Sequence, residues 1–220
     1  DAGNTVTLTM TVTSNNTCGS ATALAYYSVS VIAAPTATAG GSSDICYSSG
    51  GTATVSGATA ANGTIAWAEN GSGSITSGAT TLTPTYTAAA GDVGQTRTLT
   101  MTVSNGVCHD AIAYYSINVY AMPTATAGGS KTICQTGAAT VSGASSSNGT
   151  RLWTHNGTGI LSNATSLTPT YTANAGDAGH AVTLTMTVTN GSCTASAIYT
   201  VNVDPLPTAT AAGSTTVCYS

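Results

Sequence analysis

Charged side chains are scarce in this sequence of 220 residues, which contains three Lys or Arg, seven Asp or Glu, and no Phe. The basic residues Arg97, Lys131 and Arg151 are scattered, so they cannot form a surface that neutralises a run of phosphates. We therefore expect no nucleic-acid partner. No apolar run approaches the ~18 residues of a membrane span, so membrane insertion is not expected either. Because 41% of the residues are hydrophobic, the low charge does not indicate disorder.

An internal repeat is the strongest feature that is present. The string Pro-Thr-Ala-Thr-Ala begins at Pro35, Pro123 and Pro207, at intervals of 88 and 84 residues. Between these prolines, Thr-Val-Ser-Gly, Trp, Leu-Thr-Pro-Thr-Tyr-Thr, Ala-Gly-Asp and Leu-Thr-Met-Thr-Val recur in the same order. We expect the sequence to be a segment of a longer tandem array of modules. The repeat divides it into the C-terminal part of a module (1–34), two complete modules (35–122 and 123–206) and the start of another (207–220).

The spacing of apolar residues predicts an all-β fold. Residues 5–12 alternate Thr with Val, Leu or Met, which places the apolar side chains on one face of a strand, and the pattern returns at 99–103 and 182–188. About seven short strands per module, with turns every 8–12 residues, favour tandem immunoglobulin-like β-sandwich modules in an extended array. The shorter strands of the first complete module are expected at 52–56, 64–68, 74–76 and 81–87.

The six cysteines fall into two classes, with one of each class per module. Members of the first class follow each repeated proline by eleven residues: Cys46, Cys134 and Cys218. Members of the second class lie just after the long Thr-rich strand: Cys18, Cys108 and Cys193. This regular usage predicts structural disulfides and an oxidising, extracellular environment.

The pairing of the cysteines follows from the expected topology. In such a sandwich the last hairpin turn lies at the same end as the N-terminus of the domain, which favours the pairs Cys46–Cys108 and Cys134–Cys193 within modules. The alternative links consecutive modules through the pairs Cys108–Cys134 and Cys193–Cys218. Under the favoured scheme two cysteines pair outside this window: Cys18 and Cys218.

No group of residues indicates catalysis or a cofactor. Asp1, Asp92 and Asp177 recur in phase, but calcium needs six to eight oxygens and no further acids cluster with them, so turn-capping carboxylates are favoured. The histidines lack any readable acid or nucleophile partner, so we expect no enzyme, no cofactor and no metal site. The histidines in question are His109, His155 and His180.

The aromatic residues divide into core and surface candidates. Four rings at fixed positions within strands are expected to be core anchors rather than sugar-stacking platforms: Trp67, Trp153, Tyr86 and Tyr171. Neighbouring strand residues point to opposite faces, so one ring of each Tyr-Tyr doublet is expected to face outward. Tyr26 and Tyr114 are the candidates for contact with a neighbour or ligand. The outward Thr-x-Thr rows, nearly free of charge, favour lateral packing.

The ordered motifs, from Pro-Thr-Ala-Thr-Ala-Gly-Gly-Ser-x-x-Ile-Cys to Leu-Thr-Met-Thr-Val, resemble a known family. They look like the PKD-like, immunoglobulin-like tandem repeats of giant surface adhesins of gliding bacteria, which are exported by type IX secretion. The resemblance covers the whole chain. It implies PKD-like modules on the cell surface and no catalytic residues.

These patterns favour a structural, non-catalytic role. We expect a disulfide-stapled stalk of an extracellular adhesin or secreted filament, whose partners are neighbouring modules of the same chain and lateral copies. The alternative is a repeated glycan- or polymer-binding module that acts by avidity. Two further alternatives are ice binding through the Thr rows and assembly by strand sharing between chains. Strand sharing is disfavoured because a module assembled from residues 1–34 and 207–220 would lack the middle strands of the repeat, including the one that contains Trp.

Overall fold

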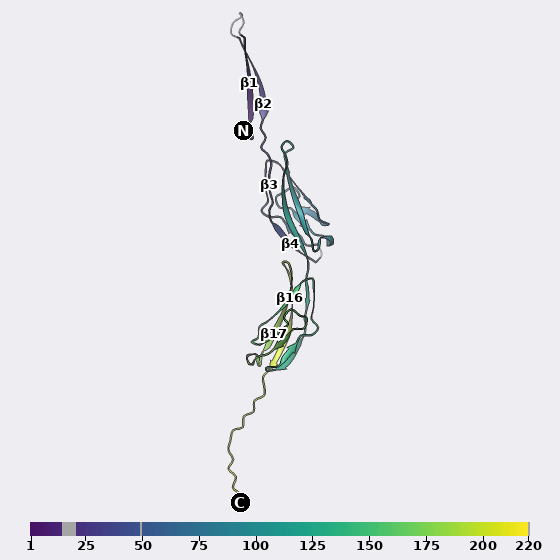
Figure 1. Ribbon diagram of the computed structural model, residues 1–220, viewed down its shortest axis with the longest axis vertical. Coiled ribbons are helices and arrows are strands. Elements are labelled where there is room, and N and C mark those ends of the chain that lie inside the picture. The colour runs from purple at the N-terminus through teal and green to yellow at the C-terminus, as the bar shows by residue number, and fades with distance from the viewer. Residues whose placement is uncertain (15–20, 49, 220) are drawn as a thin grey trace. The chain divides into compact units, whose positions relative to one another are not determined.

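The computed structural model describes residues 1–14, 21–48 and 50–219, in two compact units, Asp1–Val119 and Tyr120–Ser220 (Figure 1). The regular structure of these described ranges is β-strand apart from two single-turn 3₁₀ helices, η1 (Ala90–Asp92) and η2 (Ala175–Asp177). The prediction of an all-β fold is confirmed. One hydrophobic cluster lies within residues 37–119 and a second within residues 125–203, so each unit has its own core.

The first unit begins with a two-stranded hairpin and continues into a β-sandwich. The hairpin strands β1 (Thr5–Thr13) and β2 (Thr22–Ser30) pair only with each other among the described strands. In the sandwich, a sheet in the order β4-β11-β10-β7 packs against a sheet in the order β5-β9-β8, and β3 pairs with β6. The bounds are β3 Thr36–Thr38, β4 Ser42–Tyr47, β5 Thr52–Thr54, β6 Thr59–Ala61, β7 Thr64–Glu69, β8 Ser74–Ser77, β9 Thr85–Thr87, β10 Thr96–Ser104 and β11 Ala111–Ala121.

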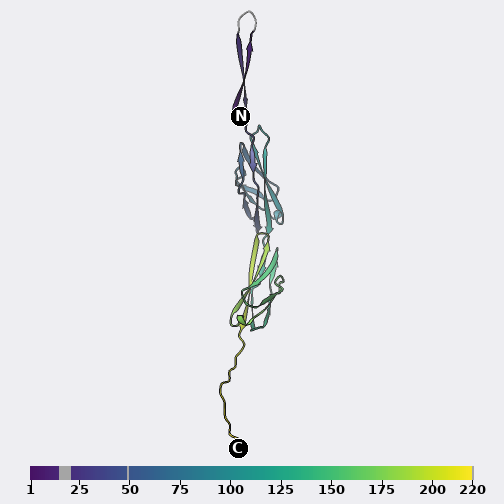
Figure 2. The same ribbon diagram turned by 60° about the vertical axis from the view of Figure 1, so that its left-hand side comes forward.

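The second unit repeats this topology. Its sheets have the orders β13-β20-β19-β16 and β14-β18-β17, and β12 pairs with β15. The bounds are β12 Thr124–Thr126, β13 Ser130–Cys134, β14 Ala138–Thr140, β15 Ser145–Ser147, β16 Thr150–His155, β17 Ile160–Ser162, β18 Thr170–Thr172, β19 Ala181–Asn190 and β20 Cys193–Asp204. β13 runs parallel to β20, with Ser130 opposite Thr200 and Cys134 opposite Asp204. From Pro205 to Tyr219 the chain has no regular secondary structure (Figure 2).

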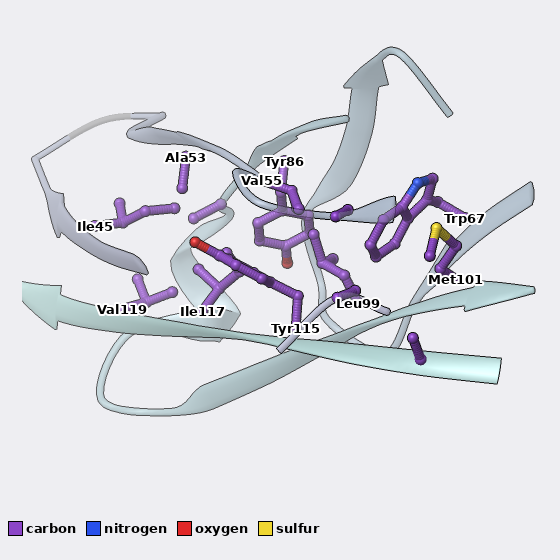
Figure 3. Packing of buried hydrophobic residues seen from close by; sticks show 14 of the residues in the cluster. Ile45, Ala53, Val55, Trp67, Tyr86, Leu99, Met101, Tyr115, Ile117 and Val119 are labelled. Atoms are coloured by element: carbon purple, nitrogen blue, oxygen red, sulfur yellow. The ribbon is translucent and has the colours of Figure 1, made fainter. Parts of the chain in front are cut away.

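The alternating apolar positions of β10 fill the core of the first sandwich. Leu99, Met101 and Val103 are fully buried between the two sheets, opposite Tyr115 and its neighbours on β11. Figure 3 shows the side chains of Leu99 and Met101 in one cluster with Tyr86 of the facing sheet. Burying aliphatic and aromatic side chains of this size contributes roughly 1.5–3 kcal/mol each, before the entropic cost of ordering the chain. In the second unit, β19 and β20 have the same pattern.

The hairpin β1–β2 has the register of the buried hairpins but a different environment. Leu8 is opposite Tyr27, just as Leu99 is opposite Tyr115 in the first sandwich. Yet Leu8 is 56% exposed, whereas Leu99 is 0% exposed. The apolar face of β1 and β2 therefore corresponds to the face that is buried in the sandwiches. Among the residues that the structure describes, no second sheet covers it.

Turn chemistry explains most strand boundaries. Asn62 and Asn148, each followed by a glycine, adopt the left-handed region at φ values of 59° and 56°. The strand expected over 81–87 is shorter than predicted, because the turn that closes between Gly78 and Thr81 and the proline at position 84 confine pairing to β9. The parallel pairing of β13 with β20 was not predicted, and it determines where the cysteines lie.

Candidate functional site

A buried carboxylate occupies the corner that follows β9. The side chain of Asp92 is 0% exposed, and its Oδ2 accepts a hydrogen bond of 2.7 Å from the hydroxyl of Tyr86. Its Oδ1 accepts a hydrogen bond of 2.9 Å from Nε of Arg97, which also forms an ion pair with it. Backbone amides complete the set of donors: those of Ser72 (2.7 Å), Gly73 (3.0 Å) and Ala89 (2.9 Å).

The second unit builds the same corner without a cation. The hydroxyl of Tyr171 donates to Oδ2 of Asp177 across 2.7 Å, and the amide of Asn174 donates to the same oxygen across 2.9 Å. Thr158 donates to Oδ1 through both its amide and its hydroxyl, at 2.7 and 3.0 Å. Val182 takes the position of the arginine in the repeat, so the carboxylate is stabilised by hydrogen bonds alone.

The corner perturbs the acidity of both partners. Burial alone would raise the pKa of Asp92, but the amides of Ser72 and Ala89 and the Tyr86 hydroxyl outweigh it and lower this pKa to about 2. Burial, reinforced by the hydrogen bond to the carboxylate, raises the pKa of Tyr86 to about 12. Asp177 and Tyr171 are shifted in the same directions and to similar values. The carboxylates are therefore ionised and the phenols neutral at physiological pH.

These carboxylates act within the fold. In the first unit, the carboxylate oxygens accept hydrogen bonds from amides of the loop between β7 and β8 and of the residue before η1, which holds the loop against η1. This arrangement fits the turn-capping interpretation. Asp1, which is in phase with them in the repeat, is exposed at the start of the hairpin. Within residues 1–14, 21–48 and 50–219, no group of three or more His, Cys, Asp or Glu side chains is placed to hold a metal ion.

A glycine motif that the sequence analysis did not single out makes the corner possible. Asn-Gly-Ser-Gly at 70–73 and Asn-Gly-Thr-Gly at 156–159 are in phase in the repeat. A Cβ at Gly71 would collide with the hydroxyl of Tyr86, and a Cβ at Gly73 would collide with the carbonyl oxygen of Thr87. Glycine is therefore required for the backbone to approach the tyrosine.

The two tryptophans are buried. Trp67 is 8% exposed and Trp153 is 2% exposed, and each indole N–H donates to a backbone carbonyl, of Thr81 at 2.8 Å and of Ser166 at 3.0 Å. The rings of Tyr86 and Tyr171 are fully buried. None of these four rings offers a free face on which a sugar can stack.

Other tyrosines are open to solvent. Tyr26 is 66% exposed and Tyr114 is 61% exposed. Both lie on the strand face that carries the Thr residues of the neighbouring strand, opposite Thr9 and Thr100 respectively. Tyr114 lies opposite Thr100, and the exposed Ile112 lies opposite Thr102, so an apolar patch on β11 borders a Thr row on β10.

The histidines are not brought together. His109 and His180 are exposed, in different units. The ring of His155 packs against that of Tyr171, with 5.0 Å between centroids, and its buried Nδ1 has no hydrogen-bond partner. A hollow of about 300 Å³ in the second unit is lined by Gly149, Arg151 and their neighbours and has no aromatic lining. Neither feature assembles a nucleophile with a base.

The predicted disulfide pairs are wrong. Cys46 and Cys193 are disulfide-bonded, whereas Cys108 and Cys134 are free thiols, so neither Cys46–Cys108 nor Cys134–Cys193 is formed. Cys218 is also a free thiol, so the alternative pairs Cys108–Cys134 and Cys193–Cys218 are not formed either. The physical reason is that β4 and β13 carry the first-class cysteine along the module, away from the hairpin turn that carries the second-class cysteine. Cys18 lies outside the described residues.

Comparisons with known proteins support the fold. No protein-family model matches the sequence, and no curated protein matches it either. The solved structure of Drosophila OTK extracellular domains 3–5 is similar over 83% of this chain and 69% of its own, with a TM-score of 0.50 and 12% identity. Sidekick-1 immunoglobulin domains 1–5 are similar over 88% of this chain, which spans 46% of theirs, with a TM-score of 0.47 and 12% identity. The chain thus has the fold of tandem immunoglobulin-like domains.

Mouse PcdhgC3 EC1–3 is another structure with similarity, over 94% of this chain and 78% of its own, with a TM-score of 0.37 and 11% identity. None of the described segments forms a helix with the length and apolar character of a membrane span.

Proposed function

We propose that this chain is a structural, non-catalytic repeat region of an extracellular filament or cell-surface adhesin stalk. Its modules are residues 35–122 and 123–206, with parts of further modules at 1–34 and 207–220. The observation that carries the proposal is the role of the two buried carboxylates. Asp92 and Asp177 cap loops in the same way in the two units, each accepting a hydrogen bond from a buried tyrosine. A chain that repeats the same core chemistry in each module is suited to spanning distance.

The location and origin of the stalk belong to the same proposal. Disulfide-bonded Cys46 and Cys193 favour an oxidising environment outside the cytoplasm. The likeness of the repeat motifs to PKD-like modules of type IX-secreted adhesins adds gliding bacteria as the source and the cell surface as the location. The partners we propose are neighbouring modules of the same chain and lateral copies that pack through the outward Thr rows.

A second candidate function has one observation in its favour. The exposed rings of Tyr26 and Tyr114 could stack on sugars, with many weak sites adding up along an array. The hollow beside Arg151 offers hydrogen-bond donors but no aromatic platform. The stalk remains the better-supported function because the exposed rings are not surrounded by convergent polar groups.

Surface display separates the two functions. Cells that display residues 1–220 alone, and cells that display the chain with a defined adhesive peptide at its tip, are compared on glycan-coated, protein-coated and peptide-receptor surfaces. A stalk adheres only through the added tip. Saturable adhesion of the tipless chain to one glycan, abolished by Tyr26→Ala with Tyr114→Ala, would overturn the stalk and favour the binding module. The matched control replaces two exposed Thr residues, Thr9→Ala and Thr11→Ala.

A further inference from the structure

We propose that the apolar face of β1 and β2, together with Asp1, is a preformed docking site for a polypeptide with the sequence character of residues 123–176, supplied ahead of β1 in the same array. The face has the residues and the register of a sandwich interior, and no second sheet covers it among the described strands. This inference rests on the proposed function, in which residues 1–34 are part of a module, and it names the partner that completes that module.

The sequence of β1 is also the sequence of a buried strand. Residues 6–13 and 182–189 are identical, Val-Thr-Leu-Thr-Met-Thr-Val-Thr. Met186 of β19 is 0% exposed, whereas Met10, its counterpart in β1, is 61% exposed. Because the two segments are the same, the difference in burial comes from what surrounds them. A strip of exposed apolar side chains of this kind marks a surface that another polypeptide covers.

The cross-strand pairs of the hairpin identify the second sandwich as its template. Four apolar pairs across β1 and β2 repeat those across β19 and β20: Val with Val, Leu with Tyr, Met with Ala and Val with Ala. The first sandwich differs at the first of these positions, where Arg97 is opposite Ile117 and the hairpin has Val6 opposite Val29. The occupant that fits this face is therefore of the type that completes the second sandwich.

Asp1 has the place of the corner carboxylates, and the turn that follows it is formed. The amide of Asn4 donates to the carbonyl of Asp1 across 2.9 Å, and the amide of Gly3 donates to the carbonyl of Val31 across 2.7 Å. The second unit has the same two bonds after Asp177, at 3.0 and 2.7 Å. The backbone of the corner is thus present in the hairpin, but the side chain of Asp1 is exposed.

The donors that bury such a carboxylate come from the proposed occupant. Asp177 accepts hydrogen bonds from the hydroxyl of Tyr171, from the amide and hydroxyl of Thr158, and from the amide of Asn174. All three donor residues lie within 123–176. A polypeptide of this type would offer Asp1 a complete set of donors without a cation, and the buried carboxylate would fix the register of docking.

Residues 123–176 also supply the strands that surround this face in the second sandwich. β16 pairs with β19 and places Trp153 opposite Met186, and β13 pairs in parallel with β20. The sheet β14-β18-β17 covers the apolar face with side chains that include Ala139 and Tyr171. In both sandwiches these strands come before the long hairpin in the chain, which is why we place the occupant ahead of β1. Strand pairing along both edges of the hairpin would add main-chain hydrogen bonds to the apolar contact.

A fusion puts the occupant where the proposal assigns it. A second copy of residues 123–176 is joined directly to Asp1 of the full chain, so that Gly176 of the added copy precedes Asp1 as it precedes Asp177 in the second unit. The added copy carries Cys134→Ser so that it forms no disulfide. We expect the amides of β1 and β2 to exchange hydrogen at least about 100-fold more slowly in the fused chain than in the unfused chain, because a covered hairpin opens only with its sandwich.

Matched substitutions test the individual contacts. In the added copy, Trp153→Ala should lower the protection about 100-fold or more, whereas Leu152→Ala, at an exposed position, should leave it unchanged. In the hairpin, Met10→Ala should lower the protection at least about tenfold, and Thr9→Ala on the opposite face should not. Asp1→Asn should lower it at least about tenfold in the fused chain and have no effect in the unfused chain. Equal effects within either matched pair would overturn the proposal.

The strands β10 and β19 report in the same samples whether the rest of the chain is folded. If they are protected while β1 and β2 of the fused chain exchange as fast as in the unfused chain, the proposal is wrong. Protection of β1 in the unfused chain that rises with concentration, together with a doubled native mass, would place a second copy on the face and overturn the proposal as well.

The outcome is separable from that of the stalk function. Adhesion of the tipless chain to one glycan would overturn the stalk without changing hydrogen exchange in β1 and β2. An unprotected hairpin in the fused chain would overturn the docking site and leave the result of surface display as it was.

Discussion

The hydroxyl of Tyr86 donates a 2.7 Å hydrogen bond to Oδ2 of Asp92, which joins β9 to η1. The second unit contains the same bond at the same distance. In a chain with only seven acidic residues, two are therefore buried at equivalent corners of the repeat. These two charges therefore serve the fold of their modules.

Replacing the corner carboxylate should destabilise its module. In Asp92→Asn, an amide NH₂ faces backbone donors and the Arg97 guanidinium, which leaves buried donors unsatisfied. We expect a loss of about 3 kcal/mol in the free energy of unfolding of the first sandwich. Urea unfolding followed by Trp67 fluorescence, in a Trp153→Phe background, measures this loss.

The matched control for this variant is Asp44→Asn. Asp44 is exposed and accepts one hydrogen bond, from Asn118, so its replacement should change the free energy of unfolding by less than about 0.5 kcal/mol. Equal effects of the two variants would refute a special role for the corner.

Stability should fall at both pH extremes because of the same pair. The pKa of Asp92 is about 2 in the folded chain against an ordinary value of 3.8, so its contribution is complete above pH 4 and is lost as the pH falls toward 2. The pKa of Tyr86 is about 12 against 10.0, so destabilisation begins above pH 10 as the unfolded chain releases the proton. Each carboxylate contributes on the order of 2 kcal/mol at neutral pH.

The measurement is the urea midpoint from pH 2 to 12, which should form a plateau between about pH 4 and 10. Tyr86→Phe is the informative variant, because it removes the alkaline titration of this site. A midpoint that stays constant down to pH 2 in the unsubstituted chain contradicts the low pKa of the corner carboxylates.

Period-two alternation was sufficient to predict the long strands. The Thr-rich segments at 99–103 and 182–188 form β10 and β19, with the apolar residues buried as the alternation requires. The Asn-Gly turns were predictable because few other residue pairs accept the left-handed backbone at low cost. The core position of the corner tyrosines followed from their fixed place in the repeat.

Sequence patterns could not determine the cysteine pairing. Residues 130–134 are short and mixed in character, so nothing in them indicates that β13 pairs in parallel with β20 rather than with an adjacent strand. That single pairing moves Cys134 to the far end of the module. The signal that was available was the eleven-residue interval from Pro123, since eleven extended residues span the length of the sandwich.

Leu8 and Leu99 form a matched pair for measuring what the covering sheet contributes. They occupy the same place in the repeat and face equivalent tyrosines, but one is exposed and the other is buried. Leu99→Ala should lower the free energy of unfolding by about 2–5 kcal/mol, and Leu8→Ala by less than about 0.5 kcal/mol. Urea unfolding of both variants tests this difference.

Hydrogen exchange gives an independent readout of the same contrast. The amides of β1 and β2 should exchange far faster than those of β10 and β11, because only the latter hairpin is buried in a sandwich. Comparable protection of the two hairpins would show that the apolar face of β1 and β2 is covered in solution.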